Sequence, residues 1–281
     1  VTVLPLMPVN ISQMFEEGLE RVPSPELFDH VRIITSSGGN LTGKMIRECE
    51  HTFRKAAFFS MHGLTEAFRS TYLHPSQVKI RPESIGKPIP DVELYVINEE
   101  GQECKPREVG ELIHRGGYIY RGYWNAPEEN AERFKSIEIL KEVVNLEGQL
   151  TDEIVVASGD YVYRDEEGYF YFVSRKDDMI KTRGFRVSPY EIESVVMNNL
   201  PQIERCAVFS RENELIEEEI ILVYSAPHEI TEKEILFELK KHLASYMLPA
   251  RIVYKKSLPL VQSDKNQINK EELKREMESL A

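Results

Sequence analysis

Apolar and polar positions along the first part of the chain predict strands that alternate with helices. Short apolar runs and stretches of helical spacing follow one another, with strands expected at residues 1–4, 31–35 and 56–59 and helices at 11–19 and 41–53. Each of the last two strands leads into a loop of small and polar residues. Ligands bind at the carboxyl edge of an open α/β sheet, so both loops are candidate ligand sites.

From residue 86 the pattern changes to short strands of alternating polarity with turn residues between them. The expected strands are residues 93–97, 110–114, 155–156, 161–163 and 169–173. We therefore predict a β-rich subdomain over residues 86–173, an all-β insert or a small β-barrel.

Helices and strands alternate again after residue 177. The expected helices are residues 189–199 and 231–244, and the expected strands are 203–209, 219–225 and 251–254. Pro189 suits the first position of a helix, where its missing N–H is not needed. The acidic stretch 212–219 is interpreted as a solvated loop or turn. This part predicts a compact α+β domain.

The fold class predicted from the whole pattern is α/β. It comprises an α/β layer plus the small β-barrel, followed by the compact α+β domain. The chain has 281 residues and opens on Val1 rather than Met, so we expect it to be a piece of something longer.

Composition narrows the possible partners and the compartment. Hydrophobic residues make up 41% and the net charge is −12, which excludes disorder by composition and argues against nucleic acid as a partner. No apolar run approaches the roughly 20 residues of a transmembrane segment. Cys49, Cys104 and Cys206 are odd in number and far apart, so we expect a reducing, cytoplasmic location without disulfides or a structural zinc.

Four segments are unusual when taken together, and three of them carry groups suited to nucleotide chemistry. Thr65 can donate to a phosphate oxygen and Glu66 can hold Mg²⁺, while Asp160 follows an apolar strand and can accept hydrogen bonds from both ribose hydroxyls. Segment 110–125 holds the only Trp, and segment 174–187 has seven charges that could neutralise phosphate. Taken singly, each has a structural alternative: a surface turn, aromatic packing at the rim of a sheet, or a solvated charged face.

The order and spacing of these segments resemble the adenylate-forming superfamily of acyl-CoA synthetases, nonribosomal-peptide adenylation domains and luciferases. The resemblance covers essentially the whole chain. Five segments are similar to motifs of the superfamily. In chain order they are residues 37–39 (adenine-side loop), 62–66 (aromatic-Gly-x-Thr-Glu), 110–125 (Gly-Glu-Leu…Arg-Gly-Tyr), 158–160 (Thr-Gly-Asp) and 174–187 (hinge motif). Within the superfamily, residues 155–168 and 178–189 look most like acyl-CoA ligases associated with exosortase systems.

The resemblance implies an AMP-forming ligase. Such enzymes activate a carboxylic acid with Mg·ATP to an acyl-adenylate and then transfer the acyl group to the pantetheine thiol of CoA or an acyl carrier protein. Implied domains are residues 1–173 as the downstream part of the adenylation core (1–85 and 86–173), a hinge at 174–177, and a mobile domain at 178–281.

The resemblance also implies roles for single residues. The implied nucleotide-binding set is Gly38, Gly39 and Asn40 along the adenine, His62 stacked on it, Thr65 at the phosphate, and Asp160 and Arg175 at the ribose. Glu66 would hold Mg²⁺, and Thr65, Glu66, Lys265 and Arg186 form the implied catalytic set. Asp177 would be the hinge residue, and Gly184 would let the pantetheine thiol pass close to the backbone.

The chain departs from the superfamily pattern in three places. His62 stands where Tyr or Phe is usual. The catalytic lysine falls on Lys265 when counted from Leu258-Pro259-Leu260, but on Gln267 when counted back from Lys270. The Ser/Thr/Gly-rich phosphate-binding loop has no match between Val1 and Ala281, so we predict that these 281 residues do not catalyse adenylation alone.

Two other functions compete with the acyl-CoA ligase. One is an amino-acid-adenylating domain, which the retained motifs do not exclude. The other is a non-catalytic descendant that binds a nucleotide or a partner protein. The uncertain lysine and the missing phosphate-binding loop favour that second alternative. Against it stands the joint retention of Thr65, Glu66, Asp160, Arg175 and Arg186.

Overall fold

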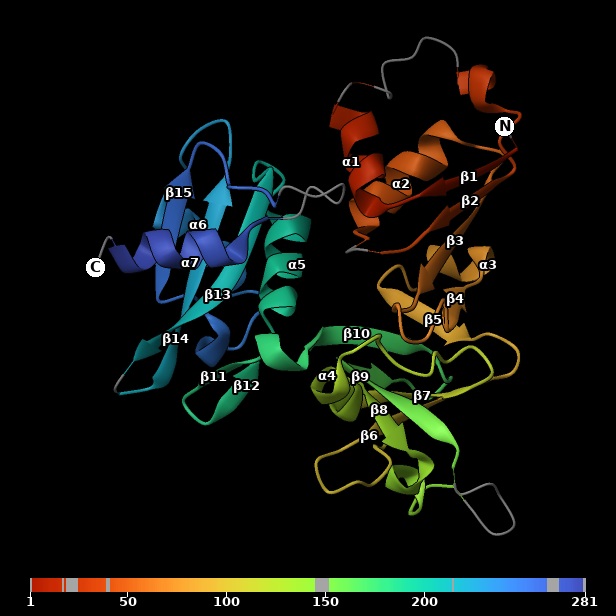
Figure 1. Cartoon of the computed structure of the whole chain (residues 1–281). Helices are drawn as coiled ribbons and strands as arrows, with labels where there is room; N and C mark the ends of the chain where they lie inside the picture. The colour runs from red at the N-terminus through yellow and green to blue at the C-terminus, as the bar shows by residue number, and fades with distance from the viewer. Residues whose placement is uncertain are drawn as a thin grey trace. The chain divides into compact units, whose positions relative to one another are not determined.

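The computed structural model divides the chain into two compact units, Val1–Lys176 and Asp177–Ala281 (Figure 1). It describes residues 2–16, 18, 25–38, 41–144, 152–213, 215–261 and 268–279. Each unit has its own sheet and its own hydrophobic core.

The first unit is built on a ten-stranded sheet in the order β1-β2-β3-β4-β5-β10-β9-β7-β6, with β8 paired to β9. The strands β1 to β3 are parallel, and the other pairs are antiparallel. Their bounds are β1 Val3–Leu6, β2 Ile33–Ser36, β3 Ala57–His62, β4 Thr71–Leu73, β5 Ser84–Pro88, β6 Val92–Ile97, β7 Gly110–Gly116, β8 Phe134–Ser136, β9 Ile154–Arg164 and β10 Phe170–Arg175.

The predicted small β-barrel is wrong for the described residues. The strand β5 pairs with β4 on one side and β10 on the other, so the β-rich part continues the α/β sheet. Among the described residues no pairing closes the β-rich strands on themselves, because β6 pairs only with β7 and β8 only with β9.

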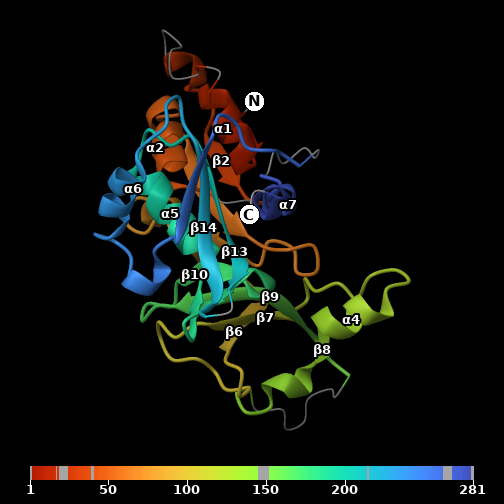
Figure 2. The same cartoon turned by 90° about the vertical axis from the view of Figure 1, so that its left-hand side faces the viewer.

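Two helices cover the parallel strands. The helices are α1 (Pro8–Glu16) and α2 (Gly43–Thr52) (Figure 1). Their residues Ile11 and Ile46 pack in one buried cluster with Ile34 of β2 and Phe58 of β3. The Thr42 hydroxyl caps α2 by accepting the Met45 N–H at 3.2 Å. Two short helices follow, α3 (Pro75–Val78) and α4 (Pro127–Arg133), and α4 lies against β8 and β9 (Figure 2).

The second unit is a five-stranded sheet with helices on both faces. The order is β12-β11-β14-β13, and β15 pairs in parallel with β14. The bounds are β11 Ile180–Thr182, β12 Phe185–Val187, β13 Arg205–Asn213, β14 Glu217–Ser225, β15 Arg251–Lys255, α5 Pro189–Asn199, α6 Glu232–Leu239 and α7 Lys270–Ser279. The predicted helix at 189–199 agrees with α5, whose Ser188 hydroxyl accepts the Glu191 N–H.

The long strands β13 and β14 alternate their side chains between two cores. Val208 and Leu222 face α5 and α6, whereas Phe209 and Ile221 face α7. Helices on both faces of the sheet make this unit the α+β domain that the alternating pattern predicts.

The acidic stretch 212–219, interpreted as a solvated loop or turn, contains a turn at residues 215–216, but the residues on either side of it belong to strands. The strand β14 begins at Glu217, and Glu218 accepts from the Lys181 N–H and the Ser210 hydroxyl, each at 2.5 Å. Glu219 is buried against Arg211. Strand pairing and these local partners accommodate carboxylates that composition alone assigns to solvent.

Candidate functional site

A buried carboxylate, Asp160, lies at the centre of the polar site of the first unit. It sits on β9 with a side chain that is 5% exposed, and its Oδ1 accepts from Arg175 Nη1 of β10 at 2.5 Å. Its backbone N–H donates to the Ser158 hydroxyl, which in turn donates to the Leu112 carbonyl of β7. The Ser-Gly-Asp segment of β9 is therefore fixed from two neighbouring strands.

His62, the last residue of β3, reaches the same carboxylate. Its Nε2 lies 3.3 Å from Asp160 Oδ2, and its ring is 6.2 Å from that of Phe172. Burial opposes ionisation of Asp160, but the contacts with His62 and then Arg175 outweigh burial and hold the pKa of Asp160 below its usual value. The structure thus brings together His62, Asp160 and Arg175, three residues of the expected nucleotide-binding set.

Glu111, in the Gly-Glu-Leu segment, links the Ser-Gly-Asp segment of β9 to Lys176, the last residue of the unit. Its Oε1 accepts the Gly159 N–H at 3.1 Å, and its Oε2 accepts from Lys176 Nζ at 2.9 Å. Sequence reasoning assigned neither Glu111 nor Lys176 a role. Their positions within two of the expected motifs were the only signal that could have found them.

The loop that carries Thr65 and Glu66 is held against the Arg-Gly-Tyr segment. The Glu66 carbonyl accepts the Tyr120 N–H at 2.9 Å, and Ala67 forms a bridge with Ile119. Thr65 is exposed and Glu66 is half-buried. Two segments that are about fifty residues apart in the sequence are therefore held side by side.

Close backbone packing explains the glycine of this loop. A Cβ on Gly63 would lie 2.2 Å from the backbone nitrogen of Arg69, which is a prohibitive contact. The loop therefore folds back on itself directly after β3, and it does so only with glycine at position 63.

Most of the aromatic residues at 118–124 are not packed at the rim of a sheet, as the structural alternative would require. Trp124 is 91% exposed and Tyr120 is 59% exposed. Tyr123 does pack, edge-on against Phe134 at 5.5 Å. The packing interpretation is wrong for Trp124 and Tyr120.

A second histidine, His114, lies beneath the site and was missed by sequence reasoning. Burial, followed by the nearby His62, lowers its pKa to about 3, although the Asp160 charge opposes that shift. Neither ring nitrogen has a hydrogen-bond partner within the described residues. His114 is therefore a neutral imidazole at physiological pH.

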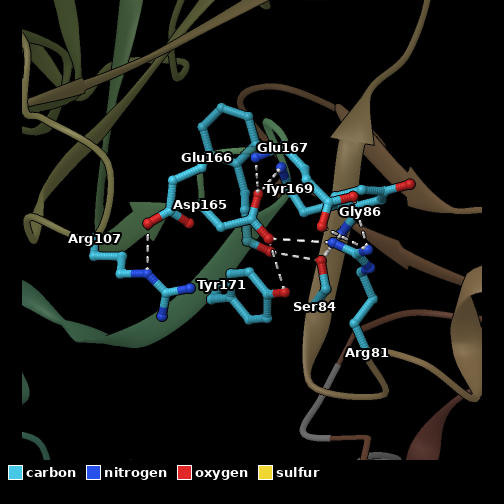
Figure 3. A network of polar contacts seen from close by, with 10 residues as sticks. Arg81, Ser84, Gly86, Arg107, Asp165, Glu166, Glu167, Tyr169 and Tyr171 are labelled. Atoms are coloured by element: carbon cyan, nitrogen blue, oxygen red, sulfur yellow. Dashed lines mark hydrogen bonds and ion pairs between the residues drawn. The ribbon is translucent and has the colours of Figure 1, made fainter.

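The hairpin between β9 and β10 is tied to the segment after α3 by the network in Figure 3. Asp165 Oδ1 accepts the backbone N–H groups of Glu167 and Tyr169 at 3.0 and 2.9 Å. Its Oδ2 accepts from Arg81 Nη1 at 3.2 Å and from the Tyr171 hydroxyl at 3.1 Å. The Arg81 guanidinium also lies 3.9 Å from the Tyr169 ring centre. The strands that carry Asp160 and Arg175 are thereby held together at their far end.

The remaining expected residues lie elsewhere. Gly38 is exposed after β2, whereas Gly39, Asn40, Lys265 and Gln267 lie outside the described residues. Asp177, Gly184 and Arg186 belong to the second unit and are exposed; Asp177 is in a short 3₁₀ helix, Lys176–Asp178. In the part of the chain that is described, no three His, Cys, Asp or Glu side chains form a metal-binding group. Glu66 is therefore a single candidate ligand.

The sequence matches the AMP-binding enzyme family over residues 1–124 and the AMP-binding enzyme C-terminal domain over residues 191–265. The chain belongs to this family. The expected superfamily is confirmed, and the association with exosortase systems stays a prediction.

Relatives within the AMP-binding enzyme family include ligases and peptide synthetases. The chain is 34% identical over 208 residues to the uncharacterized acyl–CoA ligase YtcI of Bacillus subtilis, covering 72% of this chain and 36% of that protein. It is 31% identical over 243 residues to acetyl-coenzyme A synthetase of the same organism, covering 84% and 39%. It is 30% identical over 267 residues to a component of the linear gramicidin synthase of Brevibacillus parabrevis, covering 94% and 3%.

Solved structures of the AMP-binding enzyme family share the fold. An o-succinylbenzoate CoA synthetase from Bacillus subtilis, in complex with its acyl-adenylate, superposes with a TM-score of 0.79 at 24% identity, over 98% of this chain and 51% of that one. The amide bond synthetase McbA from Marinactinospora thermotolerans gives 0.81 at 18% identity, over 99% and 52%. The predicted α/β class is confirmed, and the chain spans about half of these structures and little more than a third of the two Bacillus ligases.

Proposed function

We propose that this chain forms the adenylate-binding part and the mobile C-terminal domain of an AMP-forming acyl-CoA or acyl-carrier ligase. The substrate would be a carboxylic acid that is activated with ATP and passed to the thiol of CoA or of a phosphopantetheine-bearing carrier protein. The observation that carries the proposal is the buried Asp160 carboxylate between Arg175 and His62.

The geometry of Asp160 suits a ribose. An ionised carboxylate has about four lone-pair positions. Arg175 takes one on Oδ1 and His62 faces one on Oδ2, so each oxygen keeps a position for one ribose hydroxyl. In this proposal the adenine stacks on His62, along the loop that begins at Gly38.

The roles of the other residues are part of the same proposal. Thr65 and Glu66 would face the phosphates, because their loop follows the strand that carries His62. A lone Glu66 fits Mg²⁺, since this ion is usually bound by one or two carboxylates together with the phosphates of the substrate. When bound, Mg²⁺ would neutralise phosphate charge. Lys265 or Gln267, together with Arg186, would act from the mobile domain.

In the second unit, Asp177 is proposed as the hinge residue and Gly184 as the wall of the thiol channel. Gly184 has φ +77° and nothing lies within 4 Å of the position of its missing Cβ. An added side chain would therefore point into free space, where a pantetheine chain could otherwise pass. We place the protein in the cytoplasm because Cys49, Cys104 and Cys206 are free and buried. No helix among the described residues has the length and apolar character to cross a membrane.

Nucleotide binding tests this proposal without requiring turnover. Calorimetry should detect binding of AMP and of a non-hydrolysable acyl-sulfamoyl adenosine to the 281-residue protein. Asp160→Asn should weaken both by about tenfold or more, because hydrogen bonds between the ribose hydroxyls and a charged acceptor are lost. Glu138→Gln, at an exposed carboxylate on the same unit, is the matched control. Equal binding by wild type and Asp160→Asn would contradict the proposal.

Turnover by the isolated chain is a separate question. We expect no ATP–pyrophosphate exchange from these 281 residues with any fatty or aryl acid, because no phosphate-binding loop is found in their sequence. Clear exchange would show that other residues bind the triphosphate.

A second candidate is an amino-acid-adenylating domain. It is favoured by the 30% identity to the gramicidin synthase component over 94% of this chain. Paired titrations with a fatty-acyl and an aminoacyl sulfamoyl adenosine would separate the two. Tighter binding of the aminoacyl analogue would favour the second candidate.

A further inference from the structure

We propose that His62 is a positioning residue for Asp160, and that it sets the preference of the site for ribose in addition to stacking on the adenine. Nε2 of His62 would hold Oδ2 of Asp160 while Arg175 holds Oδ1. The carboxylate would then present one free lone pair on each oxygen to the two ribose hydroxyls. This inference rests on the proposed function.

The contact joins residues from three strands. His62 ends β3, Asp160 lies on β9 and Arg175 ends β10. Nε2 and Oδ2 are 3.3 Å apart, and the two side chains are 19% and 5% exposed. A contact this close between two largely buried groups is poorly screened by water.

The imidazole nitrogen is available for this role. Nε2 of His62 is buried, and within the described part of the chain it has no hydrogen bond of good geometry. Hydrogen bonds at binding sites are often long or poorly aligned without ligand and tighten when the ligand binds. We expect the 3.3 Å contact to become such a bond when the ribose fixes the carboxylate.

The other groups near His62 do not take over this function. His114 of β7 is buried and neutral, with a pKa lowered to about 3 by burial, and so it brings no charge to compete for Asp160. Phe172 of β10 contacts the His62 ring and has no donor. Arg175 is already bonded to the other carboxylate oxygen.

The two proposed roles of His62, holding the Asp160 carboxylate and stacking on the adenine, can be separated experimentally. Phenylalanine at position 62 keeps a flat ring but has no N–H, whereas glutamine keeps an N–H donor but has no ring. Comparing AMP with 2′,3′-dideoxyadenosine monophosphate isolates the ribose hydroxyls, because the adenine and the phosphate are the same in both.

Calorimetry with these two nucleotides is the test. We expect the wild type to bind AMP about tenfold more tightly than the dideoxy nucleotide. His62→Phe should remove most of that preference by weakening AMP alone, and Asp160→Asn should remove it as well. The double variant should show no further loss, because both changes break the same unit. His62→Gln should weaken both nucleotides and keep part of the preference.

His51→Phe, at an exposed histidine on α2, is the matched control and should leave both affinities unchanged. A His62→Phe protein that retains the full preference for AMP, or that loses affinity equally for both nucleotides, would overturn the inference and leave the proposed function standing. A wild type that binds neither nucleotide would overturn the proposed function, and the inference with it.

Discussion

The buried residue His114, beneath the polar site, makes the stability of the folded protein depend on pH. His114 is fully enclosed next to His62 and Asp160, where burial keeps its imidazole neutral. Because His114 is neutral, it adds no charge beside the Asp160 carboxylate, which within the described part of the chain is held by His62 and Arg175. In the folded chain the His114 imidazole therefore stays unprotonated, whereas in the unfolded chain it binds a proton readily.

Replacing His114 should therefore change the acid stability of the protein. The pKa of His114 is about 3 when folded and close to 6.5 when unfolded, so the unfolded state binds more protons between these values. The free energy of unfolding is therefore not reduced by His114 above pH 6.5. It decreases as the pH falls below this value, by about 2 kcal/mol at pH 5. His114→Leu should lack this loss.

Urea unfolding at pH 7.5 and pH 5.0 measures the difference. His51→Leu, at an exposed histidine, should keep the acid sensitivity of the wild type. Parallel losses in His114→Leu and the wild type would show that His114 is protonated in the folded protein.

Gly159 gives a second prediction at this scale. Its φ is +68°, and a Cβ there would lie 1.9 Å from Arg133 Nη1. Gly159→Ala should cost about 1–2 kcal/mol for the backbone, plus a further loss for the displaced Arg133. Gly168→Ala is the matched control, because Gly168 has φ +82° and nothing within 4 Å of its missing Cβ.

The double variant Gly159→Ala/Arg133→Ala should separate these two costs. When Arg133 is already alanine, adding Gly159→Ala should lower the free energy of unfolding by no more than Gly168→Ala lowers it in the wild type. Urea titration of the wild type, the three single variants and the double variant supplies the five unfolding free energies. An equal cost with and without Arg133 would mean that the guanidinium moves away freely.

Among the elements, the hairpin of β9 and β10 matters most, because it carries both Asp160 and Arg175. Asp165 in its turn is satisfied on both oxygens, and Arg81 reaches it from outside the hairpin (Figure 3). The Arg81–Asp165 pair is mostly buried, with side chains that are 13% and 9% exposed. A neighbouring pair, Arg107–Glu166, is 68% and 61% exposed.

These two pairs allow a controlled comparison. Arg81→Met should lower Tm by several degrees, because it leaves a buried carboxylate short of a partner. Arg107→Met should change Tm by about a degree or less, since exposed ion pairs contribute little. Differential scanning calorimetry measures both. Equal shifts would mean that burial does not strengthen the Arg81 contact.

Local sequence signals predicted individual elements well and their assembly poorly. Ser188 and Pro189 define the start of α5, because capping and a missing N–H are local properties. The pairing of β5 with both β4 and β10 depends on contacts between distant segments, and the predicted barrel failed for that reason. His62 and Asp160 were both named from motifs, but their mutual contact was not, because about a hundred residues separate them in the sequence.

For the whole molecule, the decisive property is that each unit has a core of its own. The second unit buries one apolar cluster under α5 and α6 and another under α7. A domain with its own core can fold alone. We expect residues 177–281, produced separately, to unfold in one cooperative urea transition followed by circular dichroism. A gradual, non-cooperative loss of signal would show that the unit needs the rest of the chain.

The position of α7 also has a consequence during synthesis. The side chains of Ala207, Phe209, Ile221 and Val223 lie on the face that α7 covers with Leu273 and Met277. Those strands are made some fifty residues before their cover. Until residues 270–279 have left the ribosome, a nascent chain therefore carries a bare apolar strip of the kind that chaperones bind and that drives aggregation.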